Sequence, residues 1–226
     1  MTDLSVRDGY PGTSMNKVNR NSSDVSADRR KQILRAAIDV FAERGFHRTR
    51  VSDIAKKAGV AYGLIYHYFE SKDDVLDSVF KDNWSIFLKV LRDLRDDESK
   101  PVVERLGVVA DSMLEALHVA PALVQVIIQE VSRSDRFVHR EKFEAFQEAF
   151  ESVQAIIEQG QASGEIRTDV DAQIAPFIFF GALETVCTGS TLKLLVCESD
   201  DQRRALKKTV RSMLLSGLVL SKENSL

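Results

Sequence analysis

Apolar side chains recur every three or four positions along most of this chain, the spacing that places them on one face of an α-helix. In the first such stretch, Leu34, Ile38 and Phe41 share a face, and Gly45 follows as a helix-ending glycine. No stretch shows a convincing strand signature, in which apolar and polar residues alternate between turns. The pattern predicts an all-α protein of about nine helices, at residues 26–44, 51–58, 62–69, 72–92, 101–117, 121–128, 136–159, 171–195 and 201–220.

The composition of the 226 residues fits a globular chain, with 44% hydrophobic and 29% charged residues. The longest nearly unbroken apolar run covers about ten residues, 174–183, whereas a membrane-spanning helix needs about twenty. The N-terminal stretch lacks the apolar segment of a signal peptide, and two cysteines, Cys187 and Cys197, are too few for a disulfide framework. We therefore expect a cytoplasmic protein with no membrane partner.

Charge is distributed unevenly within the overall net charge of −3. Residues 1–72 hold 13 Lys and Arg against 8 Asp and Glu, a net charge of +5, whereas residues 73–226 hold 18 against 26, a net charge of −8. A cationic end suits a polyanionic partner, although an excess of this size also arises by chance. Charge and helix pattern together divide the chain into a polar tail expected to be disordered (1–25), a helix-turn-helix domain (26–71) and a helical body (72–226).

Two short predicted helices, 51–58 and 62–69, are joined by a tight turn at Gly59 and have the form of a helix-turn-helix. Ile65 and Phe69 would hold the second helix against the first, so that its opposite face can enter the major groove of DNA. By periodicity alone, any two short helices of a bundle share this pattern. The exposed face of the second helix would carry Tyr62, Gly63, Leu64, Tyr66 and His67.

A larger set of residues around these two helices forms a more specific pattern: Ala36, Phe41, Gly45, Phe46, Thr49, Val51, Asp53, Ile54, Ala55, Ala58, Gly59, Val60, Gly63, Ile65, Tyr66, Tyr68, Phe69, Lys72, Val75 and Leu76. With these residues, the stretch 33–75 resembles the N-terminal DNA-binding domain of the tetracycline-repressor (TetR/AcrR) family. The resemblance implies a dimeric, ligand-responsive transcription regulator, usually a repressor, whose homodimer binds palindromic double-stranded operator DNA.

Carried over position by position, the family's DNA-contacting sites fall on Arg50, Ala61, Tyr62, Gly63, Leu64, Tyr66, His67 and Lys72. Three of these sites depart from the family pattern. Arg50 stands where Thr is usual, which leaves Thr49 to cap the helix, and Ala61 lacks the usual capping hydroxyl of Ser. Leu64 is apolar where a base-reading polar residue is common, and it would either touch a thymine methyl or only fill space.

The remaining sites divide into two expected roles. Tyr62 and His67 are the best candidates for base edges, although His67 suits a solvated surface equally well. Tyr66 and Lys72 are candidates for phosphate oxygens, which fix the position of a protein on DNA without reading its sequence.

The body offers aromatic and aliphatic residues for a pocket that takes an apolar small-molecule effector. Core packing alone explains each of these residues at least as well. The segment 143–181, with its Gly-Glu-Ile-Arg turn at 164–167, is loosely similar to fatty-acid-responsive members of the family, which implies a fatty acid or acyl-CoA. The candidate pocket residues are Trp84, Phe87, Leu91, Met113, Leu117, Val124, Ile127, Phe143, Phe146 and Phe150.

The two C-terminal helices are candidates for the dimer interface, because 171–195 is apolar on too many faces for a surface helix. Together with 201–220 it would form half of a two-fold symmetric four-helix contact. Simple core packing is the alternative explanation. The candidate interface residues are Ile178, Ala182, Val186, Val210, Leu214 and Gly217.

Catalytic and metal-binding signatures are missing from the sequence. It has no Ser/His/Asp set in a catalytic motif, no phosphate-binding glycine loop and no zinc spacing among its four His and two Cys. We expect no enzyme, no metal and no cofactor. The hypothesis is that an effector shifts the long helix from 72, separates the recognition helices and releases DNA. A multidrug-responsive efflux regulator, and a helical small-molecule carrier or interaction module, are the alternatives.

Overall fold

The computed structural model describes residues 22–131 and 140–219, with side chains described for 24–129 and 144–219. Within these ranges the chain is helical without strands, apart from one isolated bridge between Ile166 and Val219, and the all-α prediction is confirmed. The helices are α1 (Ser22–Arg44), α2 (Val51–Ala58), α3 (Tyr62–Tyr68), α4 (Lys72–Asp96), α5 (Val102–Val119), α6 (Pro121–Val131), α7 (Arg140–Ser163), α8 (Ala175–Thr191) and α9 (Asp200–Ser216).

Some helix ends differ from the prediction because side chains and turns set them. Helix α1 begins at Ser22, inside the stretch 1–25 assigned to a disordered tail, and residues 1–21 of that stretch lie outside the described ranges. Helix α8 begins four residues later than expected, because Asp171 Oδ1 accepts hydrogen bonds from the backbone N–H groups of Gln173 and Ile174 and makes a turn there. Helix α4 begins as expected, with Ser71 Oγ accepting from Asp74 N.

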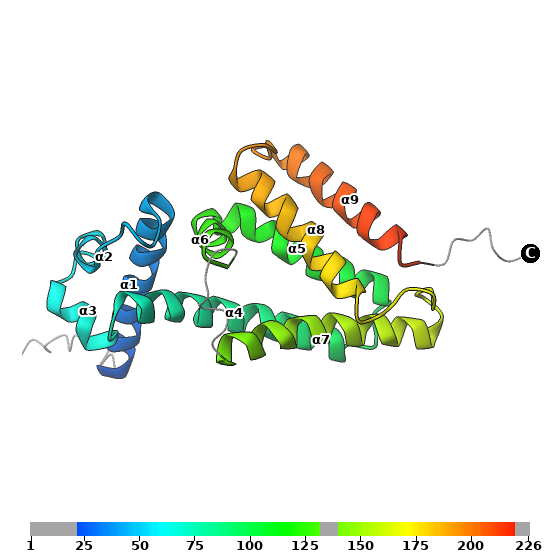
Figure 1. Ribbon diagram of the computed structural model, residues 1–226, viewed down its shortest axis with the longest axis horizontal. Coiled ribbons are helices and arrows are strands. Elements are labelled where there is room, and N and C mark those ends of the chain that lie inside the picture. The colour runs from blue at the N-terminus through cyan, green and yellow to red at the C-terminus, as the bar shows by residue number, and fades with distance from the viewer. Residues whose placement is uncertain (1–21, 132–139, 220–226) are drawn as a thin grey trace, which may run out of the picture.

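Helices α1, α2 and α3 form a small head at one end of the molecule (Figure 1). Phe41 of α1, Ile54 of α2 and Ile65 of α3 are buried together in its core. Gly59 adopts a left-handed conformation with φ 65° and ends α2, so that α3 can turn across it. Three residues of α4 and Val126 of α6 complete this core, so its packing extends past residue 71.

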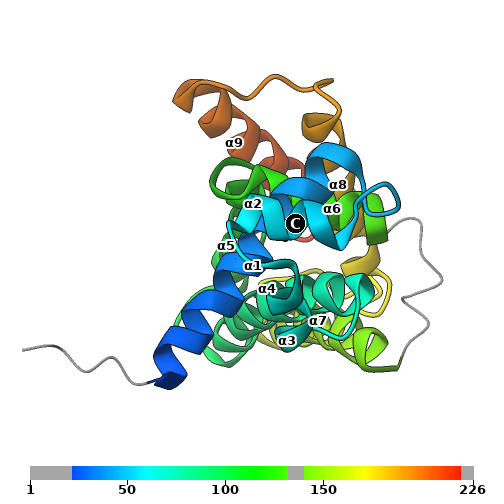
Figure 2. The same ribbon diagram turned by 90° about the vertical axis from the view of Figure 1, so that its left-hand side faces the viewer.

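The other helices form a body around α5, which packs against α7, α8 and α9. Helix α4 runs out of the head and lies along α7, so it belongs to both units, while α8 and α9 each pack on α5, on the side away from α4 (Figures 1 and 2). A second hydrophobic core fills the body. Its largest fully buried side chains are Leu91, Leu106, Ile156, Ile157, Ile166 and Leu183.

A buried arginine fixes the end of α4 that lies in the body. Arg105 of α5 is 3% exposed, and its Nη1 donates to the carbonyl oxygens of Leu94 (3.3 Å) and Arg95 (3.1 Å) and to Gln159 Oε1 (2.7 Å). The last carbonyls of a helix carry partial negative charge, so a guanidinium is a favourable partner there. The body end of α4 is therefore anchored to α5 and α7.

Helix α9 is attached to α5 by ion pairs. Arg211 Nη1 lies 2.8 Å from Asp111 Oδ2, and Lys207 pairs with Glu115, whose pKa the Lys207 ammonium lowers by hydrogen bonding and charge.

In the described ranges no single helix is long and apolar enough to cross a membrane. The helical segments Val102–Val119 and Pro121–Gln129 reach the length and apolar composition of a membrane span only when they are taken together, and the chain bends by 108° between them.

Gly160 in α7 provides a test of how tightly the body is packed. A Cβ at this position would collide with Ile166 and lie 2.9 Å from Val102 Cγ1. Gly160→Ala should therefore lower the free energy of unfolding by about 1–3 kcal/mol, as overpacked cores do, although alanine favours helix. Chemical denaturation measures the change. Gly63→Ala is the matched control, because a Cβ there meets nothing within 4 Å; equal stabilities for the two variants would show that Gly160 has room to spare.

Candidate functional site

The predicted recognition surface lies on α3, a helix of only seven residues with one buried and one open face. Ile65 is buried against the head core, as is Phe69 directly after the helix. The opposite face is open, with Tyr62 54% and Tyr66 47% exposed. Ala61, Gly63 and His67 are also exposed, whereas Leu64 is half-buried. The predicted face of the second helix is thus free to meet a partner.

Tyr62 and Tyr66 form a pair one helical turn apart. Their hydroxyl oxygens are 3.1 Å apart in a hydrogen bond, and their rings meet edge to face with centroids 5.3 Å apart. This hydrogen bond raises the pKa of Tyr66 above its usual value. Each ring restricts the other, so the pair acts as one preorganised aromatic unit. The sequence indicated two separate tyrosines and gave no signal for their hydrogen bond beyond the spacing of four.

The expected cap of α2 is wrong. Arg50, and not Thr49, is the N-cap residue, and its backbone N–H donates to Asp53 Oδ2 at 3.0 Å, which lowers the pKa of Asp53. Thr49 is buried, and its Oγ1 donates to the carbonyl of Gly45 at 2.9 Å. The Arg50 side chain is consequently left exposed at the start of α2. Ala61 is the N-cap residue of α3 and makes no side-chain capping bond.

Lys72 has a structural role that the sequence did not indicate. Its Nζ donates to the carbonyl oxygens of Phe46 (2.8 Å), Thr49 (2.9 Å) and His47 (3.5 Å), and it lies 4.2 Å from the centre of the Phe46 ring. The ammonium therefore closes the segment between α1 and α2 onto the start of α4. In this conformation the Lys72 ammonium makes its hydrogen bonds within the protein and is not turned outward toward a phosphate.

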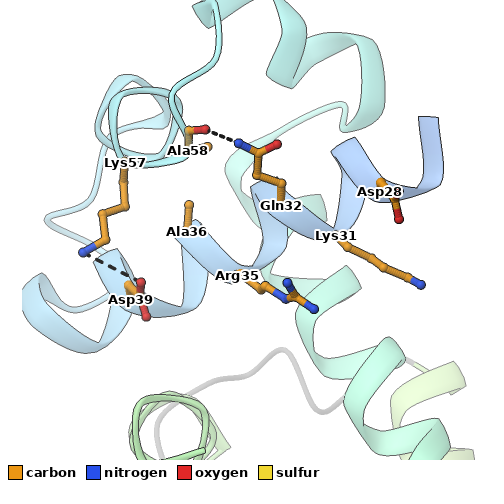
Figure 3. Close-up of a pocket in the computed structure, with 8 residues that line it drawn as sticks. All are labelled: Asp28, Lys31, Gln32, Arg35, Ala36, Asp39, Lys57 and Ala58. Carbon is orange, nitrogen blue, oxygen red and sulfur yellow. Dashed lines mark hydrogen bonds and ion pairs between the residues drawn. The ribbon is translucent and has the colours of Figure 1, made fainter. Parts of the chain in front are cut away.

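A hollow of about 480 Å³ lies between α1 and the end of α2 (Figure 3). Gln32 Nε2 donates to the carbonyl of Ala58 at 2.7 Å, and Lys57 pairs with Asp39, so that α2 is tied to α1. Lys31 and Arg35 point away from Ala58 and Lys57. These two cations of α1 are exposed beside the head core.

The predicted effector residues fall into two groups. In the first, Trp84 stacks near Phe146 with ring centroids 4.4 Å apart and near Phe87 at 5.5 Å, while Phe150 lies 5.0 Å from Phe180. Helices α4, α7 and α8 thus bring these rings together. Phe177 and Phe180 of α8 join this aromatic cluster (Trp84, Phe87, Phe146, Phe150, Phe177 and Phe180), although we expected α8 to serve dimerisation alone.

The second group is spread more widely over the body. Leu91 is fully buried in the body core, and Met113 packs on that core, as Trp84 and Phe87 also do. Leu117 lines a separate hollow of about 210 Å³ with residues of α9. Val124 and Ile127 lie on α6, on the head side of the body. The side chain of Phe143 lies outside the described residues.

The predicted dimer residues also divide. Ile178 of α8 is 66% exposed and Gly217 is exposed, whereas Ala182 and Val186 are half-buried. Val210 is 7% exposed and belongs to the body core, so a single chain offers little of this side chain to a partner.

Leu214 packs on the same core, because α9 turns Val210, Leu214 and Leu215 inward. Met213, one position away, points outward at 75% exposure.

Among the described residues, no group of three or more His, Cys, Asp or Glu is placed to hold a metal ion.

Two family models match the chain. One, described as bacterial regulatory proteins of the tetR family, matches residues 33–79, and a tetracyclin repressor-like C-terminal domain matches residues 99–188. The fatty acid metabolism regulator protein of Bacillus subtilis is 31% identical over 191 residues, which cover 83% of this chain and 94% of that protein.

Two solved structures are similar to this chain both in fold and in sequence. The fatty acid degradation regulator FadR of Bacillus halodurans superposes with a TM-score of 0.74 at 31% identity, covering 84% of this chain and 95% of that one. The transcriptional regulator FadR of Bacillus subtilis, solved in complex with stearoyl-CoA, gives a TM-score of 0.71 at 31% identity, with coverages of 83% and 98%. All these relatives are regulators and not enzymes.

Replacement of Lys72 tests its structural role. Lys72→Met should lower the free energy of unfolding by about 1–2 kcal/mol, because three carbonyl oxygens lose a charged donor. It should also weaken binding to all DNA duplexes alike, because the segment carrying Arg48 and Arg50 loosens. Denaturation and DNA titration measure both effects. Lys81→Met on the exposed face of α4 is the control; if the two variants were equally stable, the three hydrogen bonds would not anchor the segment.

Proposed function

Because the chain belongs to the tetR family of bacterial regulatory proteins, whose members bind operator DNA as dimers, we propose that it is a repressor released from its operator by a long-chain acyl-CoA. Regulation of transcription follows from the family; the identity of the effector and the roles of single residues are the proposal. The observation that carries the proposal is the combination of two features in one chain. The head presents the open face of α3, and the body contains the aromatic cluster.

The proposed DNA contacts follow the exposure of the head residues. Tyr62 and His67 would reach base edges from α3, where Gly63 allows close approach of the backbone. Arg50 and the hydroxyl of Tyr66 would contact phosphates, which position the helix in the groove, and the Tyr66 ring would remain free to face the bases. Lys72 would act mainly by holding the α1–α2 segment in place. Ala61 and Leu64 would contribute van der Waals contacts only, since neither has a polar side chain.

The proposed division of labour places DNA binding in residues 26–71 and effector binding and dimerisation in residues 72–226. In a dimer, two heads would meet half-sites about one helical turn apart, roughly 34–36 Å. The exposed apolar faces of α8 and α9, with Ile178 and Met213, support their use as the symmetric interface. The proposed place of action is the cytoplasm, where the operator lies.

The choice of effector rests on the aromatic cluster and on the relatives. A regulator 31% identical to this chain has been solved with stearoyl-CoA bound. In this chain, six aromatic rings from α4, α7 and α8 gather in the body, an environment that suits a long acyl chain. The acyl chain would enter beside Trp84, whose Nε1 donates to the carbonyl of Ala145 at 3.0 Å and ties α4 to α7.

Two helices would carry the effector signal to the head. Helix α4 is anchored by Arg105 at its body end, so a change beside Trp84 would displace its head end. Helix α6 also reaches the head, because Val126 is buried in the head core and Gln125 Nε2 donates to the carbonyl of Ala42 of α1 at 2.9 Å. The effector can shift this equilibrium only by binding one arrangement more tightly than the other.

The direct test combines DNA selection with effector titration. From a pool of random duplexes at physiological salt, the chain should enrich an inverted repeat, and stearoyl-CoA should dissociate that complex. Trp84 is the single tryptophan of the chain, so its fluorescence should change on titration with stearoyl-CoA. Free coenzyme A, which lacks the acyl chain, should leave both DNA binding and fluorescence unaltered.

Each alternative has its own signature in this experiment. Release by triclosan but not by stearoyl-CoA would favour a drug-responsive efflux regulator. Binding of stearoyl-CoA without enrichment of any duplex would indicate a helical carrier and would refute the proposed repressor.

Gln125 tests the route through α6. Gln125→Ala removes the hydrogen bond to Ala42, so release of the operator should need about fivefold more stearoyl-CoA, while DNA affinity without effector stays nearly constant. Fluorescence anisotropy of labelled operator measures both quantities. Gln129→Ala, on the same helix and without a hydrogen bond among the described residues, is the control. An unchanged stearoyl-CoA requirement in Gln125→Ala would exclude this contact from the signal path.

A further inference from the structure

The recognition helix lacks the side chains that usually read bases. Between Ala61 and Phe69 the sequence is Tyr-Gly-Leu-Ile-Tyr-His-Tyr, without Arg, Lys, Asn or Gln. Bidentate hydrogen bonds to guanine come from Arg or Lys, and those to adenine come from Asn or Gln. Helix α3 can make neither kind of contact. Its sequence preference must therefore depend on other features of the base pairs.

The exposed area of α3 is mainly aromatic. The Tyr62–Tyr66 pair projects from the helix with about half of each side chain open, and the half-buried Leu64 lies on the same short helix. The hydroxyl–hydroxyl bond and the edge-to-face contact hold the two rings in one arrangement before DNA arrives. Little side-chain entropy remains to be lost on binding, so this surface is built for contact with an apolar group.

The major groove offers one apolar group, the C5-methyl of thymine. The cations of the head lie elsewhere: Arg48 and Arg50 come before and at the start of α2, and Lys31 and Arg35 lie on α1. Positioning on the phosphates and reading of the bases thus fall to different elements of the head.

We propose that α3 reads its operator through thymine methyl groups, which pack on the rings of Tyr62 and Tyr66 and on Leu64. His67 is the polar side chain of α3 that remains for a base edge. This inference rests on the proposed DNA-binding function and specifies the chemistry of its partner: half-sites rich in thymine at the positions facing α3. The rings of the tyrosine pair, more than their hydroxyls, carry the preference.

The test uses the operator that the chain itself selects from random duplexes. Each thymine is replaced in turn by deoxyuridine, which removes only the methyl group and keeps every hydrogen-bonding group. At one or more positions of each half-site, the substitution should weaken binding about fourfold per methyl, the effect expected for loss of one buried methyl. Positions outside the region facing α3 should show no change and serve as internal controls.

Variants of the tyrosine pair assign the effect to these rings. Tyr66→Phe keeps the ring and should retain the difference between thymine and deoxyuridine operators. Tyr66→Ala removes the ring, so the two operators should bind alike at the position it contacts, and Tyr62→Ala should do the same at its own position. Both residues are exposed, so circular dichroism should show folded proteins. Tyr68→Phe, half-buried on the same helix, is the control and should retain the full difference.

The outcomes separate this inference from the function on which it rests. Enrichment of an operator that tolerates deoxyuridine at every position would overturn methyl reading and leave the repressor proposal intact. Methyl sensitivity that persists in both alanine variants would also overturn it, because the contact would then belong to other residues. Failure to enrich any operator would overturn the DNA-binding function and this inference together.

Discussion

The structure depends on one helix that belongs to two hydrophobic cores. The first turns of α4 contribute Val75 and Leu76 to the core of the head, and its later turns contribute Leu88 and Leu91 to the core of the body. Neither core is complete without this helix, so the head and the body cannot move independently of it. Since Arg105 fixes the body end, a tilt of α4 about that end would move α3 together with the head end of the helix.

The net charge of the N-terminal segment overstates the charge available to DNA. Arg30 pairs at 2.6 Å with Asp82, an acid outside the segment, and Lys72 is held by backbone carbonyls. Arg44 pairs with Asp53 at 3.0 Å, a pair that the net charge already counts as neutral. These pairs are partly exposed and stabilise the fold only modestly. Their larger effect is to fix α1, α2 and α4 relative to one another, which leaves a few exposed side chains, such as Arg50, to meet an anionic partner.

Periodicity and glycine positions were sufficient to predict the all-α fold and the open face of α3, because both depend on local spacing. Contacts between distant segments could not be predicted in the same way. Nothing in the sequence near Lys72 indicates that its ammonium meets carbonyls more than twenty residues earlier. Thr49 was misassigned as a cap for the same reason, since its partner is the carbonyl of Gly45 in a closed loop. In α9, Val210 and Met213 are both apolar, and the packing of α9 on α5 decides which of them is buried.

The exposed apolar faces of α8 and α9 have a consequence for how this protein accumulates in a cell. A single folded chain presents Phe177, Ile178 and Met213 to water, and in the proposed dimer a second copy would cover them. Folding and assembly are then linked by mass action, and the apparent stability of the protein rises with its own concentration. A newly made chain at low abundance is thus the form most exposed to proteases and aggregation, which sets a lower limit on the expression level at which such a regulator persists.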